Sequence, residues 1–478
     1  MKEIKSILPG QFEPENHWYP KALNATIHPL VSFFFNLSKE QIINRYCHLR
    51  PTVNADALKE VLAYKPKYFF WSGADLFNVT TADGKKQMVI IENNSCPSGQ
   101  KSMPSLSDHD EYGGYKILMD QSFCPILKTR RGPKGALAVI YDKNPMEASG
   151  YASALADAIG EEVHLVPYYK DEVGTRVRSR EGVLEFTRNG TDYTPIRATF
   201  RYLTQKPWNR LPVNQRTFIY NPIVACLAGG RNKMVAAKAY DFYNGELSHS
   251  GLKVFTPETI RDVGKSEIPL WVRKMGGQAV VKNPYSNAGQ GVYTIINQEE
   301  LDRFMEQDFE YDLFIVQSLI GNYKWSSTTS RGKLYHVGTL PNKRGESFAA
   351  DLRMMVCATS NGFRPLSIYS RRARKPLLND LVDGGESWDM LGTNLSIKND
   401  DGSWGSDTNR LMLMDRKDFN KVGVSLDDLI EAFIQTVLST IAIDKLARNL
   451  FNAKGKFRRK LFQSLNNDDA LLSEILLA

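Results

Sequence analysis

A lysine and two glycines lie close together in residues 278–297, QAVVKNPYSNAGQGVYTIIN. Two short apolar segments rich in β-branched residues flank a polar turn, which predicts a hairpin with a flexible loop. Gly289 and Gly291 have no Cβ, so the loop backbone can approach phosphate oxygens closely. Lys282 ends the first strand and adds a positive charge for the same phosphates. The pattern indicates either a phosphate-binding loop or an ordinary hairpin with a solvated lysine, because a single G-x-G is weakly specific.

Three oxygen-bearing side chains lie in a second predicted hairpin, over residues 68–94. Two apolar strands are joined there by an Asp-Gly turn, a dipeptide that favours tight hairpins. Asp75 lies inside the first strand. Glu92 and Asn94 end the second strand, and their two-residue spacing points both side chains to the same face. Carboxylate and amide oxygens are ligands that Mg2+ prefers. The residues therefore indicate either a magnesium site or polar positions near a turn and a loop.

A second lysine follows the glycine-containing segment LAGGRNK. A helix is predicted to begin there, with Asn232 near its N-cap and Lys233 in its first turn. A helix N-terminus and a lysine can bind an anion together. A surface lysine on an amphipathic helix fits the same pattern, so both interpretations stay open.

The surrounding pattern predicts a mixed α/β and α+β architecture that would position these side chains. Residues 136–168 are typical of a strand–helix–strand unit in a parallel sheet, and residues 183–204 of a strand pair. Residues 1–65 and 426–478 are predicted to be mainly helical. The apolar stretch 429–447 contains two acidic residues and a glutamine, which favours a buried helix over a membrane span.

Further polar side chains lie on predicted strands in the second half of the chain. FIVQSLI places Gln317 in an apolar strand, and DLRMMVC places Asp351 and Arg353 on one face of another. Residues 364–375 carry a basic cluster that would either hold an anionic substrate or solvate a strand. Residues 384–394 are predicted to form a polar turn.

The bulk composition is that of a globular protein, with 42% hydrophobic and 24% charged residues among 478. This length suggests roughly three domains. The net charge of +8 suits anionic ligands, nucleotides included. Five widely spaced cysteines without a C-x-x-C motif predict reduced thiols in a cytoplasmic protein. The N-terminal residues lack the apolar segment of a secretory signal, and no P-loop motif or nucleic-acid-binding module is present.

Together these motifs resemble an ATP-grasp enzyme, in which two α+β lobes hold ATP beneath a glycine-rich hairpin. The acidic E-x-N strand, Glu92-Asn93-Asn94, precedes both lysines in the chain. This order is similar to that of the circularly permuted ATP-grasp group, which includes glutathionylspermidine synthase-like carboxylate–amine ligases. The resemblance covers roughly residues 65–125 and 190–395.

The resemblance implies roles for individual residues. Lys233 and Lys282 would bind the phosphates of ATP, and Gln317 would hold adenine. Arg353 would be the catalytic arginine. The segment FRYLTQKPW, which contains Arg201, also resembles a segment of the group. Asp75, Glu92 and Asn94 would bind Mg2+. The covering loop would contribute Ser286, Gly289, Gln290 and Gly291.

The chain also departs from the ligase pattern. The position two residues before Asp75, an arginine in those ligases, is Gly73, so Arg353 or Arg201 would have to take over its contact with phosphate. No accompanying amidase segment is recognisable, so a polyamine substrate is not carried over.

The domains implied are an N-terminal helical flank over 1–65, the metal-binding part of the large lobe over 66–135, a small α/β domain over 136–222, the small lobe with the glycine-rich loop over 223–330, the rest of the large lobe over 331–425, and C-terminal helices over 426–478.

The function implied is ATP-dependent ligation of a small-molecule carboxylate to an amine, through an acyl-phosphate, with release of ADP and phosphate. The alternative is a non-catalytic nucleotide-binding or scaffold protein that retains the ATP clamp. The basic charge alone would also suit nucleic acid, but the sequence lacks a module with interleaved aromatic residues. The identities of the acid and the amine, and the oligomeric state, are not set by these motifs.

Overall fold

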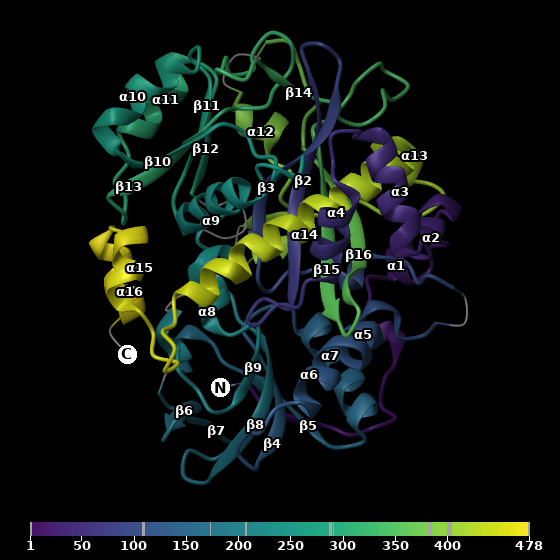
Figure 1. The fold of residues 1–478 in the computed structure, drawn as a ribbon, viewed down its shortest axis with the longest axis vertical. Coiled ribbons are helices and arrows are strands. Elements are labelled where there is room, and N and C mark those ends of the chain that lie inside the picture. The colour runs from purple at the N-terminus through teal and green to yellow at the C-terminus, as the bar shows by residue number, and fades with distance from the viewer. Residues whose placement is uncertain are drawn as a thin grey trace.

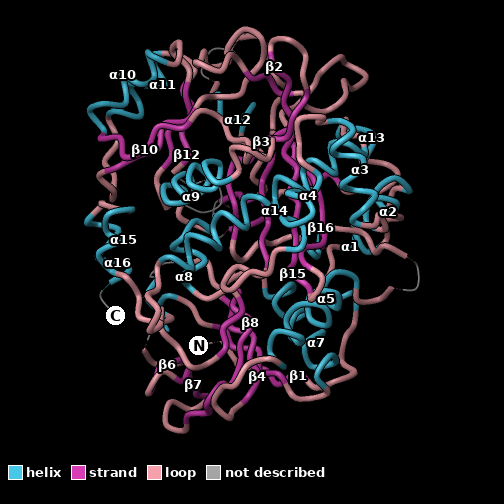
Figure 2. Tube along the Cα trace, in the orientation of Figure 1, coloured by secondary structure: helices cyan, strands magenta, loops and turns pink. Residues whose placement is uncertain are grey.

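The computed structural model describes residues 2–107, 110–172, 174–205, 208–285, 289, 291–380, 385–398 and 404–476. Within them the helices and strands form a mixed α+β structure with three larger sheets and one two-stranded ribbon. Figure 1 shows an α/β unit at the bottom, a large sheet crossed by a long helix in the centre, and a four-stranded sheet at the upper left. Figure 2 shows the same arrangement by secondary structure. The expected mixed architecture is confirmed.

The central sheet joins strands that are far apart in the sequence. Strand β2 lies between β3 on one side and β15 on the other, all antiparallel. The register places Asp75 of β2 opposite Arg353 of β15, and opposite Glu92 of β3. The hairpin predicted over residues 68–94 is therefore present, and it pairs with a strand nearly 280 residues later. The strands of this sheet are β2 (Trp71–Thr81), β3 (Lys86–Asn94), β14 (Leu334–His336), β15 (Ala350–Thr359), β16 (Gly362–Arg372) and β19 (Leu411–Met412).

A long helix, α14 (Leu426–Asn449), packs across this sheet and against the N-terminal helices (Figure 1). Ser425 and Asp428 form a capping box at its start. Almost every residue from Asp428 to Ala447 is buried, so the prediction of a buried helix is confirmed. The helices that pack against it include α2 (Pro29–Phe35), α3 (Lys39–Leu49), α4 (Ala55–Ala63), α8 (Ile223–Ala225) and α9 (Lys233–Glu246). Two further short helices are α1 (Pro20–Leu23) and α13 (Phe419–Val422).

The α/β unit contains the strand–helix–strand motif predicted over residues 136–168. Its sheet has the order β1-β5-β4-β8-β7-β6, and β9 pairs with β8. Strands β4, β5, β8 and β9 are mutually parallel, and helix α7 connects β4 to β5. The N-terminal residues, expected as a helical flank, also add β1 to this sheet. The elements are β1 (Lys5–Ile7), α5 (Gly113–Leu118), α6 (Cys124–Lys128), β4 (Ala136–Tyr141), α7 (Pro145–Ile159), β5 (Val163–Pro167), β6 (Val177–Arg180), β7 (Val183–Thr187), β8 (Tyr193–Tyr202) and β9 (Phe218–Tyr220).

The four-stranded sheet contains the hairpin with Lys282. Strands β11 and β12 pair antiparallel, with Lys282 opposite Val292. Asn297 accepts a hydrogen bond from the Glu300 backbone N–H and so caps the next helix. The elements here are α8 (Ile223–Ala225), α9 (Lys233–Glu246), β10 (Thr259–Gly264), α10 (Ile268–Lys274), β11 (Ala279–Lys282), β12 (Val292–Ile295), α11 (Gln298–Met305) and β13 (Leu313–Gln317).

One short element differs from the sequence expectation. Residues 384–394 were expected to form a polar turn, but Ser387–Leu391 form the helix α12. The cause is a tertiary contact, because the Glu300 carboxylate accepts hydrogen bonds from the Ser387 backbone N–H (2.8 Å) and hydroxyl (2.9 Å). The remaining elements are β17 (Ser396–Lys398), β18 (Trp404–Ser406), α15 (Arg459–Leu465) and α16 (Asp469–Leu476).

All five cysteines are free thiols, as predicted from their spacing. In the part of the chain that the structure describes, no helix combines the length and the apolar character needed to cross a bilayer.

Asp444 anchors α14 to the segment that leads into β2. Its buried carboxylate accepts hydrogen bonds from the backbone N–H groups of Lys67 (3.0 Å), Tyr68 (2.7 Å) and Phe69 (2.9 Å). A buried carboxylate that satisfies several N–H groups is costly to remove, because those donors are left without an acceptor.

We therefore expect Asp444→Ala to lower the free energy of unfolding by on the order of 3 kcal/mol or more. The measurement is the thermal unfolding midpoint. Asp427→Ala is the matched control on the same helix, since its ion pair with Arg45 is largely exposed and contributes little to stability. Equal midpoint shifts for the two variants would contradict this assignment.

Candidate functional site

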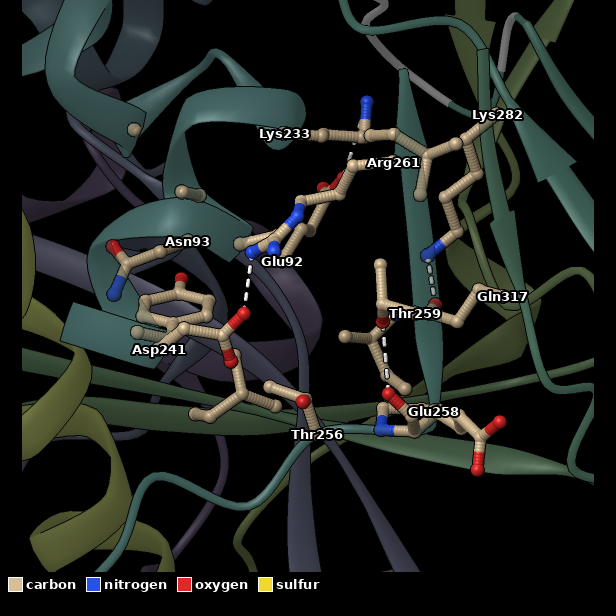
Figure 3. Close-up of a pocket in the computed structure, with 18 of the residues that line it drawn as sticks. Glu92, Asn93, Lys233, Asp241, Thr256, Glu258, Thr259, Arg261, Lys282 and Gln317 are labelled. Atoms are coloured by element: carbon tan, nitrogen blue, oxygen red, sulfur yellow. Dashed lines mark hydrogen bonds and ion pairs between the residues drawn. The ribbon is translucent and has the colours of Figure 1, made fainter. Parts of the chain in front are cut away.

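A cavity of about 640 Å3 lies where the central sheet, the lysine hairpin and the α/β unit meet. A smaller cavity of about 150 Å3 adjoins it and shares several of its walls (Figure 3). The shared walls include residues from β3, the start of α9, the end of β11 and the end of β13. These are Glu92, Asn94, Arg231, Lys233, Lys282 and Gln317.

Lys282 is held in the wall by the strand next to it. Its Nζ donates a hydrogen bond to Gln317 Oε1 at 2.6 Å, and Gln317 Nε2 donates to Thr259 Oγ1 at 2.9 Å (Figure 3). Burial, and then the nearby charge of Lys233, lower the pKa of Lys282 to about 8. Gln317 thus orients the lysine, and the site holds a cation in surroundings that disfavour its charge.

Lys233 also lines the smaller cavity, at the first position of α9 (Figure 3). Asn232 caps this helix by accepting a hydrogen bond from the Val235 N–H at 3.1 Å, as predicted. The Lys233 ammonium lies 3.6 Å from Glu92 Oε2. Burial lowers the pKa of Lys233, and Glu92 partly opposes this shift. The structure therefore brings the two predicted lysines and the E-x-N glutamate to one cavity.

Asp75 is bound by two arginines from the neighbouring strands. Arg353 donates to both of its oxygens, from Nε at 2.5 Å and from Nη2 at 2.6 Å, and Arg371 Nη2 lies 3.0 Å from Oδ2. Arg371 also binds Asp351. Burial alone would raise the pKa of Asp75, but the two guanidinium groups outweigh it and hold that pKa below its ordinary value. All four side chains are buried and line the cavity.

The predicted metal ligands lie side by side but differ in what they contact. Asn94 Nδ2 is 3.5 Å from Glu92 Oε1, and Glu92 is paired with Asp75 in the strand register. Within the described residues, no group of three or more His, Cys, Asp or Glu side chains is arranged as a metal site. Two carboxylates and an amide nevertheless form a hard oxygen donor set, which suits Mg2+ when phosphate and water oxygens complete its shell.

Arg201 does not reach the cavity. It is almost fully buried between β8 and the loop after β3. Its guanidinium donates to the carbonyl oxygens of Asn221 (2.5 Å) and Leu203 (3.1 Å), and to the Ser95 hydroxyl (3.2 Å). These contacts connect the α/β unit to the end of β3, so its place in the structure is that of a positioning residue.

The glycine-rich loop is described only in part. Gly289 and Gly291 both have positive φ angles, of 78° and 66°. A Cβ on Gly289 would meet Trp388 at 2.9 Å, and the Asn283 N–H donates to the Gly291 carbonyl oxygen at 2.8 Å. Both positions therefore favour glycine, because a positive φ angle is strained for residues that carry a Cβ. Two further residues assigned to this loop, Ser286 and Gln290, lie outside the described residues.

Sequence reasoning missed several cations of the cavity. Lys143 follows β4, and its neighbours in the wall, Thr204 and Gln205, follow β8. Strands β5 and β8 flank β4 on opposite sides, so this is a point where the strand order reverses, and ligands of parallel sheets bind there at the carboxyl ends. Burial, and then Arg231, lower the pKa of Lys143 to about 7. The position of Lys143 just past a predicted parallel strand was the available signal.

Lysines and arginines outnumber carboxylates among the residues that line the larger cavity. This excess suits an anionic ligand. The cations are Lys101, Lys143, Arg231, Lys233, Lys282, Arg353 and Arg371, and the carboxylates are Asp75, Glu92, Asp142 and Asp351.

A buried glutamate shapes the loop that carries Lys101. Glu147, in the first turn of α7, accepts hydrogen bonds from the backbone N–H groups of Gly99 (2.7 Å) and Gln100 (2.8 Å), and from the Ser98 hydroxyl (2.6 Å). The acidic strand β3 and the α/β unit are thus joined next to the cavity.

No protein-family model and no curated protein matches the sequence. Several solved structures are similar in fold. A glutathione synthetase-like effector from Globodera pallida matches with 10% identity and a TM-score of 0.40, over 78% of this chain and 88% of that one. An ATP-grasp RimK-domain protein from Sphaerobacter thermophilus matches with 15% identity and a TM-score of 0.29, over 52% and 92%. D-alanyl-alanine synthetase A from Vibrio cholerae matches with 12% identity and a TM-score of 0.31, over 49% and 88%.

At these identities and TM-scores the likeness carries no argument about chemistry. The function proposed below rests on the residues of the site itself.

Asp75→Asn tests the buried charge network of the site. The variant leaves Arg353 and Arg371 with only Asp351, and we expect a loss of roughly 3 kcal/mol of stability at neutral pH. Because the folded-state pKa of Asp75 is lowered, its contribution is fully present above its ordinary pKa and is lost as the pH falls below that value.

The denaturant midpoints of wild type and variant should therefore differ by a constant amount from pH 7 to about pH 4 and converge below it. Asp389→Asn is the control, because its partner Lys375 is half exposed and the pair contributes under about 1 kcal/mol. A gap that widens on acidification would contradict the interpretation.

Proposed function

We propose that this protein is an ATP-dependent carboxylate–amine ligase of the circularly permuted ATP-grasp type. The observation that carries the proposal is the meeting of Lys233, Lys282 and Glu92 at one cavity, although they come from three separate parts of the chain. A chance surface lysine would not be buried and would not face a second buried lysine, since two desolvated cations repel each other. Such an arrangement is favourable when a polyanion binds between them.

ATP is the polyanion that fits this arrangement best. Lys233 and Lys282 neutralise its phosphates, and Gln317 orients Lys282 in the cavity wall. The hairpin with Gly289 and Gly291 covers the phosphates with backbone N–H groups. Glu92, Asn94 and Asp75 are the oxygen-bearing side chains that would hold Mg2+ here. When bound, Mg2+ supplies charge neutralisation at the phosphate oxygens.

The reaction then follows from the charges in the cavity. A carboxylate oxygen of the acid substrate attacks the γ-phosphorus, and the bond to the β–γ bridging oxygen breaks, which releases ADP and leaves an acyl-phosphate. The amine substrate attacks the acyl carbon, loses a proton and displaces phosphate, which forms the amide. The protein contributes position and charge stabilisation. Arg353, which lines the cavity beside Asp75, stabilises the transferring phosphoryl group.

The acid substrate binds toward the α/β unit. Lys101, Lys143 and Arg231 line that end of the larger cavity. Small molecules with a carboxylate and an amine are the substrate classes we propose, and the excess of cations favours a carboxylate partner.

Product analysis with wild type and Lys282→Met tests the reaction. With ATP, Mg2+ and pools of carboxylic acids and amines, the wild type should release ADP and phosphate in a substrate-dependent way. We expect Lys282→Met to lower turnover by about 100-fold or more, because it removes a charge that stabilises the transferring group.

Lys274→Met, on the exposed face of α10 in the same lobe, is the matched control and should retain activity. Release of AMP and pyrophosphate would reject the mechanism. An absence of turnover with every pool, together with Mg2+-dependent ATP binding, would favour the non-catalytic clamp instead.

The affinity for ATP should also depend on pH. Lys282 has a pKa of about 8 in the free protein, and bound phosphate favours its protonated form. As the pH rises above 8, a proton must be taken up on binding, so affinity should fall by roughly 25-fold between pH 7.5 and 9.5. Isothermal titration of a non-hydrolysable ATP analogue measures this.

Lys282→Arg stays charged throughout this range, and its affinity should be nearly independent of pH. A wild-type affinity that does not change over the same range would contradict the assigned role of Lys282.

A further inference from the structure

A third cavity, of about 930 Å3, lies outside the site described above. Its walls come from the loop before β2, the end of α6 and the loop after it, strand β9 with the segment before it, and the loop that follows α14. We name it the basic groove, because six cationic side chains line it and no carboxylate does, among the described residues. The six are Lys67, Lys128, Arg130, Arg131, Arg197 and Arg216.

These cations are poorly compensated. Arg197 pairs with Glu161 at 2.8 Å, but Lys128, Arg131 and Arg216 form no ion pair within the described part of the chain. All three are exposed at the surface of the groove. Like charges gathered without counter-charges repel one another, and this repulsion is relieved when an anionic partner binds.

Arg130 is held in place by aromatic rings. Its guanidinium carbon lies 4.6 Å from the ring centre of Phe218 and 5.9 Å from that of Phe70. Both rings are buried, so the groove has an apolar floor with a cation above it. Contact with these rings restricts the Arg130 side chain, and a restricted side chain loses less entropy when it binds a ligand.

The groove also borders a sheet edge. Strand β9 pairs only with β8 among the described strands, and Phe218 and Ile219 of β9 line the groove. An extended polypeptide can pair with such an edge through its backbone while its side chains contact the walls.

We infer that the basic groove is a docking site for an extended acidic segment of another polypeptide. The occupant combines carboxylates, which match the cations, with a backbone that can pair with β9. Single-stranded nucleic acid fits less well, because it needs exposed rings on which bases stack. Here Phe70 and Phe218 are buried, and Tyr68 and Phe451 stack on each other at 5.1 Å.

Fluorescence anisotropy with full-length protein and labelled octapeptides tests the inference. The probe is an alternating Glu-Thr peptide, and the comparisons are Gln-Thr and Lys-Thr peptides and an oligothymidylate of eight nucleotides. The acidic peptide should bind, and its affinity should fall as salt rises from about 50 to 200 mM, because salt screens exposed charges. The neutral and basic peptides should not bind measurably.

The double variant Lys128→Glu/Arg131→Glu should weaken binding of the acidic peptide by about tenfold or more. Lys343→Glu/Arg344→Glu makes the same change in net charge on an exposed loop far from the groove residues in sequence, and should weaken it by about twofold at most. Thermal unfolding of each variant checks that the fold is kept. ATP turnover is measured separately, so a failure of the ligase proposal does not affect this outcome.

Three results would overturn the inference. They are no binding of the acidic peptide at low salt, equal weakening by both double variants, and tighter binding of the oligothymidylate than of the acidic peptide.

Discussion

A buried charge network between β2, β15 and β16 sets the geometry on which the site depends. The Asp75 carboxylate accepts hydrogen bonds from Nε and Nη2 of Arg353. It also forms an ion pair with Arg371, which in turn binds Asp351. Burying two carboxylates is tolerable only because each is matched by guanidinium donors at short distance. The network therefore specifies one register between strands that are far apart in sequence. On the other side of β2, the register with β3 places Glu92 opposite Asp75.

The opposite wall of the cavity holds cations under unfavourable conditions. The pKa values of Lys282, Lys233 and Lys143 are all lowered, in each case first by burial. Each of these ammonium groups has lost part of its solvation by water, and a bound anion would compensate for that loss. Burying these lysines lowers the stability of the folded protein, but it prepares the site for a polyanionic ligand. Buried charges that destabilise a fold are expected at functional sites. The two walls therefore differ in charge. The wall with the Asp75 network is nearly neutral, whereas the wall with the three lysines is positive.

Several parts of the site could be predicted from the sequence, and several could not. The hairpins with Asp75 and with Lys282, and the capped helix that begins at Lys233, follow from strand alternation, turn dipeptides and an N-cap residue. Lys143 was missed because its neighbours in the cavity come from a strand 60 residues later. Arg201 was expected near the phosphates, but a position on a strand does not tell which layer of the fold its side chain enters.

The sequence by itself determined the local elements and the residue types available for chemistry. Alternation, capping and glycine placement act over a few residues, so a single chain segment contains all the information they need. Only the tertiary structure decided which strands became neighbours, that Asp75 is held by Arg353 and Arg371, that Glu300 begins the helix at Ser387, and that six cations gather in one groove. These outcomes depend on burial and on contacts between residues that are distant in sequence. Burial also sets the lysine pKa values, and it is a property of the packed molecule that no short segment carries.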